Sequence, residues 1–254
     1  MTSSDGLESA EVSLPRRMKL GIMQPYFFPY LGYFSLIKYV DKWIIFDTVQ
    51  YIRKGWINRN RIIDPKGGWQ YIIIPIRTTS RDTLIKDAYI SGNQNWRESL
   101  RGKLTVYKKR APYYNDVMKL IDEVIVKDIN KISKLNEVAL EKVCNYLDIN
   151  FSYEVFSQMN LEIENATDPG EWALNISKAM KAKVYTNLIG GKAIFDKQKF
   201  EKENIKLEFL NINIEPYNQG GKNFEPGLSI IDVLMFNSKE RVNEFLDNYE
   251  ITSL

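Results

Sequence analysis

The chain contains no histidine and only one cysteine, and these absences remove much of the usual catalytic chemistry. Without histidine there is no Ser-His-Asp triad, no Cys-His dyad, no imidazole base and no histidine ligand for zinc. A single cysteine, Cys144, excludes disulfides within the chain and thiolate metal clusters. We therefore predict no metal site. Cys144 lies beside an apolar helical stripe, which predicts a buried, unreactive thiol.

A strong net charge and long apolar runs are also lacking. The 254 residues carry 35 Lys+Arg against 32 Asp+Glu, and a net charge of +3 gives no strong electrostatic footprint for nucleic acid. No apolar run approaches the roughly 20 residues of a membrane-spanning helix. Residues 1–17 are polar and mixed in charge, unlike a secretory signal, and we expect them to form a disordered tail. These features predict a cytoplasmic protein without a membrane span.

From Met18 onward, strand-like and helix-like segments alternate. Residues 19–24 form an apolar run closed by Pro25, a turn and a helical stripe over 33–39 follow, and 42–47 is a second apolar run. A strand–helix–strand unit of this kind implies parallel pairing. Further strands are expected at 69–75, 183–188 and 205–214, and helices at 115–150, 169–181 and 197–203. The alternation predicts an α/β fold, a Rossmann-like mostly parallel sheet with a helical segment in the middle of the chain.

The length of the chain favours one large domain. We expect residues 18–237 to form a single α/β domain with a sub-lobe boundary near residue 110. Residues 238–254 are expected to form a C-terminal helix that begins at the cap Ser238. Another helix start is marked by Asp168, Pro169 and Glu171, in the order N-cap, first helical position and third position.

Residues 24–33, QPYFFPYLGY, form an aromatic turn framed by prolines, directly after the first strand. In open α/β sheets ligands bind at the carboxyl ends of strands. We therefore predict that the turn contacts a ligand and that its rings stack on a base or a sugar. The candidate contacts are Gln24, Pro25, Tyr26 and Tyr30. The alternative is that the aromatic residues fill the core below a sharp turn.

Tyr30-Leu31-Gly32-Tyr33 occupies the place where nucleotidyltransferases of the class I synthetase type carry His-x-Gly-His. The glycine is kept, and both histidines are replaced by tyrosines. A phenol can donate one hydrogen bond but brings no positive charge to a transferring phosphate. The resemblance implies a related first strand–helix–strand unit and a nucleotide pocket, and it argues against adenylyl transfer by the same route.

The densest polar cluster spans residues 47–61. Asp47 ends the second strand, so we expect it on the same side of the sheet as the aromatic turn. Arginine binds phosphate with two parallel hydrogen bonds and lysine binds it as a point charge, so the cluster predicts a phosphate or pyrophosphate site. The candidate contacts are Gln50, Tyr51, Lys54, Trp56, Asn58, Arg59, Asn60 and Arg61. A solvated hairpin is the alternative; RNA binding would use the same residue types, and the small net charge disfavours it.

Two later segments also carry candidate residues. Paired glycines after a predicted strand let backbone N–H groups approach an anion. Residues 224–237 combine a Pro-Gly turn with Asp232 on an apolar helical run, where an acid is either paired or at the edge of a site. A capping or helix-dipole role would also explain Asp232. The candidate ligand contacts in these segments are Asn187, Gly190, Gly191 and Ser229.

Several of these segments together resemble the WbqC-like protein family. They are MQPYFFPYLGYF, DxVQY with WINRN, the Gly-Gly stretch and FEPGLSIIDVLMFN, and the resemblance covers roughly Met18 to Asn237. Members are encoded among genes for bacterial O-antigen and other surface polysaccharides, such as lipopolysaccharide. The resemblance therefore implies transfer of an acyl or aminoacyl group, with glycyl among the candidates, onto a nucleotide-linked amino deoxysugar.

Under this implication the enzyme needs a base for the sugar amine, and no histidine is present. The candidate catalytic residues are Asp47, Tyr33 and Asp232, with Asp47 preferred as a strand-end carboxylate. The donor is expected to be an acyl-CoA, a carrier protein, an aminoacyl-tRNA, or an amino acid with ATP. Two alternatives stay open: an ATP-dependent nucleotidyltransferase or ligase, and a non-catalytic nucleotide-sugar-binding protein of polysaccharide assembly.

Overall fold

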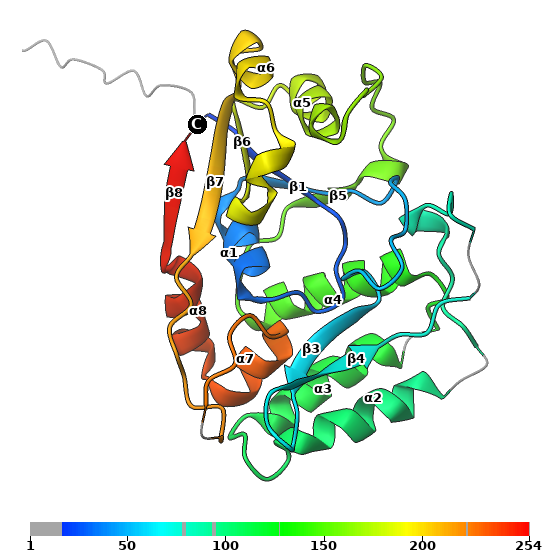
Figure 1. Cartoon of the computed structure of the whole chain (residues 1–254), viewed down its shortest axis with the longest axis vertical. Coiled ribbons are helices and arrows are strands. Elements are labelled where there is room, and N and C mark those ends of the chain that lie inside the picture. The colour runs from blue at the N-terminus through cyan, green and yellow to red at the C-terminus, as the bar shows by residue number, and fades with distance from the viewer. Residues whose placement is uncertain (1–16, 78–79, 93–94, 127, 222, 254) are drawn as a thin grey trace, which may run out of the picture.

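The computed structural model describes residues 17–77, 80–92, 95–126, 128–221 and 223–253. Its main sheet has six strands in the order β5-β2-β1-β6-β7-β8 (Figure 1). They are β1 (Lys19–Met23), β2 (Lys42–Ile45), β5 (Tyr153–Val155), β6 (Val184–Leu188), β7 (Lys206–Ile212) and β8 (Tyr249–Ser253). All neighbouring pairs are parallel except β7 and β8. The protein has the Rossmann-like α/β fold.

Helices and a separate hairpin complete the fold. The helices are α1 (Leu31–Tyr39), α2 (Trp96–Leu104), α3 (Tyr114–Ile125), α4 (Ile132–Tyr146), α5 (Pro169–Ala179), α6 (Lys197–Lys202), α7 (Ile230–Phe236) and α8 (Lys239–Asp247), with short 3₁₀ turns η1 (Ile85–Asp87), η2 (Thr105–Tyr107), η3 (Phe156–Gln158) and η4 (Ile189–Ile194). Strands β3 (Arg59–Ile63) and β4 (Trp69–Ile73) form the hairpin, which packs against α2 and α7 (Figure 1). None of the helices in the described ranges has the length and hydropathy needed to span a bilayer.

Most of the predicted elements are confirmed. Strand β1 pairs parallel to β2 across α1, with Leu20 opposite Lys42 and Met23 opposite Ile45. The helical stretch expected at 115–150 consists of two helices, α3 and α4. The strand expected at 69–75 exists as β4, but it pairs antiparallel with β3 instead of joining the main sheet.

The C-terminal segment corrects one expectation. Ser238 caps α8 as predicted, its Oγ accepting a hydrogen bond from Arg241 N at 3.3 Å. The helix ends at Asp247, however, and residues 249–253 form β8, an antiparallel edge strand on β7. Of the expected N-terminal tail, residues 1–16 lie outside the described residues. The boundary near residue 110 stays a prediction.

Alternation along the strands creates a hydrophobic core on each face of the sheet. In β2, Trp43 and Ile45 face one cluster, while Ile44 and the following Phe46 face the other. The first cluster contains Cys144, which is fully buried, and burial raises the pKa of its thiol above the usual range. This position agrees with the buried, unreactive thiol that the sequence predicts.

Helix α5 begins as the sequence predicts. Asp168 Oδ1 accepts hydrogen bonds from Gly170 N at 2.8 Å and Glu171 N at 3.0 Å. Lys199 Nζ on α6 lies 2.7 Å from Asp168 Oδ2 and 2.7 Å from Glu171 Oε1. The hydrogen bond from Lys199, followed by those from Thr167, lowers the pKa of Glu171 to about 2.

The ion pair between Lys199 and Glu171 predicts a defined pH dependence of the free energy of unfolding. Because the folded pKa of Glu171 lies below its unfolded value of 4.5, its stabilisation is present above pH 4.5 and is lost as the pH falls toward about 2. We expect Lys199→Met to reduce the loss of stability that occurs as the pH falls through this range. Urea midpoints measured at several pH values in this window should fall less steeply for the variant than for the wild type. Equal slopes would contradict the assignment.

Candidate active site

The carboxyl ends of the parallel strands lie at one edge of the main sheet. In such folds ligands bind where the strand order reverses. Here β2 lies on one side of β1 and β6 lies on the other, so the switch point is between β1 and β6. Gln24 follows β1, Asn187 lies near the end of β6, and Asp47 follows β2 by two residues. The structure therefore brings these three residues to the carboxyl edge of the sheet.

Asp47 lies in a pocket of about 430 Å³ at this edge, which we call the Asp47 pocket. Its side chain is only 2% exposed. Both carboxylate oxygens accept hydrogen bonds from Ser157, which follows β5: Ser157 N to Oδ1 at 3.0 Å and Ser157 Oγ to Oδ2 at 2.7 Å. The carboxylate is thus held in one orientation at the wall of the pocket.

Three lysines line the same pocket, Lys86 from η1 and Lys131 and Lys134 from the start of α4. Lys131 Nζ lies 3.8 Å from Asp87 Oδ1, and Lys134 Nζ lies 2.6 Å from Glu137 Oε1. Helix α4 has no acidic residue in its first turn, so the positive end of its dipole adds to the lysine charges. Asp87 and Glu137 also line the pocket, so the two ion pairs offset part of the lysine charge.

The aromatic turn is held in place by side chains from distant parts of the chain. Asn60 Nδ2 donates to Phe27 O at 3.0 Å and to Phe28 O at 2.8 Å. Ser229 Oγ donates to Phe28 O at 2.7 Å, and Asn136 Nδ2 donates to Pro25 O at 2.8 Å. Asn60 and Ser229, predicted to contact a ligand, therefore bind the backbone of the turn instead.

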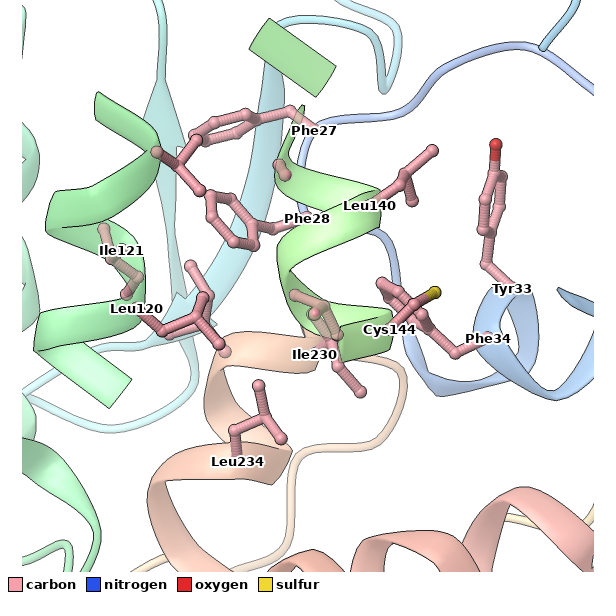
Figure 2. Close-up of a cluster of buried hydrophobic side chains, with 14 of the residues drawn as sticks. Phe27, Phe28, Tyr33, Phe34, Leu120, Ile121, Leu140, Cys144, Ile230 and Leu234 are labelled. Atoms are coloured by element: carbon pink, nitrogen blue, oxygen red, sulfur yellow. The ribbon is translucent and has the colours of Figure 1, made fainter. Parts of the chain in front are cut away.

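Core filling, the alternative considered for the aromatic turn, is correct for its central residues. Figure 2 shows Phe27 and Phe28 inside a hydrophobic cluster with Leu120 and Ile230, and both phenylalanine side chains are buried. Gln24, Tyr26 and Tyr30 are half-buried and remain candidates for ligand contact, whereas Pro25 is buried.

Tyr33 is not placed to act as a catalytic base. Its side chain is fully buried, and its hydroxyl donates to Gln24 O at 2.8 Å. Its ring packs 5.0 Å from Trp43, centroid to centroid. Burial raises the pKa of Tyr33 well above its ordinary value. Its role is to hold the turn onto α1, which corrects the sequence-based assignment.

The arginines predicted to bind phosphate lie on the hairpin rather than in the Asp47 pocket. The Arg61 guanidinium lies near two rings, with Cζ 5.5 Å from the Trp56 centroid and 5.2 Å from the Trp69 centroid. Arg59 Cζ lies 4.1 Å from the Tyr71 centroid. None of these side chains lines the Asp47 pocket. The cations of the pocket are instead the three lysines, which the sequence did not identify.

Other members of the polar cluster build the connection between β2 and the hairpin. Tyr51 is buried, with its N–H donating to Thr83 O at 2.8 Å, and Asn58 Nδ2 donates to Ile74 O at 2.8 Å. The Gln50 amide donates to Arg81 O, and Lys54, which has a φ of 60°, accepts a hydrogen bond from Arg59 at its carbonyl. These contacts are structural, and of the four residues Gln50 and Lys54 have exposed side chains.

The segment after β6 lies at the switch-point side of the edge. Asn187 is buried, donates to Tyr185 OH at 2.5 Å and accepts from Leu188 N at 2.7 Å. A Cβ at Gly191 would lie 3.0 Å from Asn187 Oδ1, so a larger residue would crowd this contact. A Cβ at Gly190 would meet nothing within 4 Å, so its backbone is open to a ligand.

Asp232 lies away from this edge, inside a buried network. Its Oδ2 accepts from Tyr107 OH at 2.7 Å, and its Oδ1 accepts from Tyr217 OH at 2.7 Å and Gln219 Nε2 at 2.8 Å. Burial raises the pKa of Asp232, while the three hydrogen bonds act in the opposite direction. Asp232 is fully buried and, unlike Asp47, does not line the Asp47 pocket, so its contacts support a structural role instead of the predicted catalytic one.

A model of the WbqC-like protein family matches residues 24–244. The chain belongs to the WbqC-like protein family. It is also 27% identical to an uncharacterized protein of Mycobacterium tuberculosis over 231 residues, which cover 90% of this chain and 97% of that protein. No solved structure matches the chain.

The WbqC-like motifs divide into two structural roles. One group joins the aromatic turn to the hairpin and α7. It consists of the buried residues of MQPYFFPYLGYF and WINRN, together with Ser229. Asp47, at the start of DxVQY, faces a pocket instead. Among the acidic side chains of these motifs, Asp47 lines the Asp47 pocket, whereas Glu225 lines a separate pocket at the turn of the hairpin.

Proposed function

We propose that this WbqC-like protein is a transferase that joins an acyl or aminoacyl group to the amine of a nucleotide-linked amino sugar. The observation that carries the proposal is the position of Asp47: a carboxylate 2% exposed, in a pocket that three lysines also line. A positioned carboxylate can accept the proton of an attacking amine. Lysines bind phosphate groups as point charges, so the pocket suits a sugar diphosphate.

The strand order suggests how a nucleotide sugar would lie along the carboxyl edge of the sheet. Neighbouring strands lie about 4.8 Å apart, so the ends of β2 and β6, which flank β1, are about 10 Å apart. A nucleotide sugar can span this distance. In the proposed complex the sugar diphosphate occupies the Asp47 pocket, and the nucleoside extends toward the switch point, where Tyr26, Tyr30 and the open backbone of Gly190 are candidate contacts.

In the proposed reaction the sugar amine attacks the carbonyl carbon of an activated acyl group. A C–N bond forms and the bond from that carbon to the leaving group breaks. Asp47 takes the proton lost by the amine and returns it to the leaving group. The donor classes that fit are a thioester of coenzyme A or of a carrier protein, an ester of tRNA, and an amino acid activated with ATP.

A mass-spectrometric product screen tests the proposal. Purified full-length protein is incubated with nucleotide-linked amino sugars and each donor class, including glycine with ATP, and matched sugars with a hydroxyl in place of the amine serve as controls. We expect a mass gain on an amino sugar and none on its hydroxyl counterpart. Release of AMP would favour the ligase alternative. Tight binding of a nucleotide sugar without any new mass would favour the non-catalytic alternative and contradict the transferase.

A further inference from the structure

The charge of the chain is distributed very unevenly. Residues 53–110 carry 14 Lys+Arg and 4 Asp+Glu, a net charge of +10, whereas the other 196 residues carry 21 Lys+Arg and 28 Asp+Glu, a net charge of −7. The basic segment contains the β3–β4 hairpin, α2 and η2, which Figure 1 shows in cyan to green. The total of +3 is therefore the difference between a strongly basic part and an acidic remainder.

The outer face of the hairpin interleaves arginines with aromatic rings. Arg59 pairs with Ile73 and Arg61 with Tyr71 across the strands, so their side chains share one face, and the alternate face with Asn60 is buried. Trp56 is 40% exposed and Trp69 is 42% exposed, although both are large rings. We call Trp56, Arg59, Arg61, Trp69 and Tyr71 the hairpin surface.

The arginines of the hairpin surface are held in fixed positions. Arg59 Nε donates to Gly55 O at 3.3 Å, and Arg61 Nη2 donates to Gly227 O at 3.1 Å. Each guanidinium also packs on an aromatic ring, as the cation–ring distances above show. Arg61 Nε is buried and has no hydrogen-bond partner among the described residues. Preorganised guanidinium groups lose little entropy when they bind an anion.

Further cations border the hairpin surface. Lys103 Nζ donates to Tyr71 O, which places α2 beside β4. Lys66 and Arg110 line a pocket of about 380 Å³ at the hairpin turn, together with the carboxylates Asp64 and Glu225. Lys108 and Lys109, next to Arg110 in the chain, are exposed. Lys103 therefore adds positive charge beside β4, and Lys66 and Arg110 add it at the hairpin turn.

We propose that the hairpin surface binds single-stranded nucleic acid, with bases stacked on its rings and phosphates paired with its arginines and lysines. This is the combination by which proteins hold single strands without sequence preference. A duplex hides the faces of its bases, and an acidic polysaccharide offers charge without flat aromatic rings. The proposal goes beyond the transferase function and does not depend on it.

The stacking part of the proposal is tested by fluorescence anisotropy. Labelled single strands of about 12 nucleotides, as RNA and as DNA of the same sequence, are titrated with the full chain, and a duplex and heparin serve as competitors. Trp69→Ala should weaken binding about 10-fold or more, and Trp69→Phe, which keeps a ring, by less than about threefold. The RNA and DNA titrations identify which of the two sources binds.

The charge part is tested with two matched triple variants. Lys66, Lys108 and Lys109 are replaced by glutamine in one, and the equally exposed Lys181, Lys183 and Lys202 in the other. Both lose the same net charge. In a plot of log K against log salt, the first variant should lose about 2 units of slope, because each phosphate contact on a single strand contributes about 0.7. The second variant should keep the wild-type slope.

Four results would overturn the proposal. They are the absence of binding at about 50 mM salt, where phosphate contacts are strong; equal losses in the two lysine variants; unchanged binding by Trp69→Ala; and competition by duplex or heparin that is as strong as by single strands. Thermal unfolding of every variant establishes that the compared proteins are folded. Because Trp69 is 42% exposed, its replacement leaves the buried core intact.

Discussion

Replacing Asp47 by asparagine is expected to lower turnover by about 10²- to 10⁴-fold, the usual contribution of a general base. Asparagine has nearly the same shape as aspartate. Its Oδ1 can still accept the hydrogen bond from Ser157 N, and its Nδ2 can donate to Ser157 Oγ, so both contacts of the wild type can be kept. The amide cannot take up the proton of an attacking amine. The loss should therefore appear in kcat, with the fold retained.

The measurement is the initial rate of product formation with the donor and sugar found in the screen, alongside thermal unfolding. Ser157→Ala is the matched control, because it removes one hydrogen bond to Asp47 and keeps the carboxylate. We expect this control to cost less than about 10-fold, since a positioned base retains its function. Full turnover by Asp47→Asn, with only stability reduced, would remove Asp47 from the proposed chemistry.

Parts of the fold with strong local signals were predictable from the sequence. Strand β1 is an apolar run closed by Pro25, and α5 starts with an Asp168 cap followed by proline, so each boundary has its own chemical cause. Strand β5 has only three residues, too few for a periodic pattern to develop. Strand β8 alternates Tyr249 and Ile251 with polar residues, but a helix pattern precedes it directly and hides its start.

The candidate site was predictable only where position along a strand decided it. Asp47 was identified because a residue after a buried strand must lie at the carboxyl edge. The lysines of its pocket come from η1 and the start of α4, which only the tertiary fold brings together. Asn60 was misassigned because its partners are carbonyls of a turn in which Phe28 has a φ of 40°, a conformation that the sequence does not signal.

The distribution of charge along the chain shows what the net charge hides. The net charge of +3 disfavours nucleic-acid binding, but it is a sum over the whole chain and hides the charge of each region. The same sequence, counted over residues 53–110, gives +10. What the sequence could not supply is the hairpin register, which places Arg61 and Tyr71 on one face and leaves Trp69 exposed beside them. Regional charge and strand register together make the surface recognisable.

Asp232→Ala is expected to lower the free energy of unfolding by about 3–5 kcal/mol, because each buried donor left without an acceptor costs about 1–3 kcal/mol. Three donors converge on this carboxylate, from Tyr107, Tyr217 and Gln219. Tyr217→Phe is the matched control, since it removes one donor and leaves two, and should cost about 1 kcal/mol. Urea unfolding gives both values. Similar losses in the two variants would show that the carboxylate is not the centre of the network.

Asp232→Asn separates the structural role from a catalytic one and has a defined pH signature. Because burial raises the folded pKa of Asp232 above its unfolded value of 3.8, the folded protein holds the proton more tightly. The stability contributed by Asp232 is therefore greatest below the unfolded pKa and decreases as the pH rises through the folded one. Asparagine stays neutral at every pH, so the stability gap between the wild type and this variant should narrow with rising pH. A gap that widens would mean that the three hydrogen bonds outweigh burial, and turnover lost by a folded Asp232→Asn would return Asp232 to the catalytic candidates.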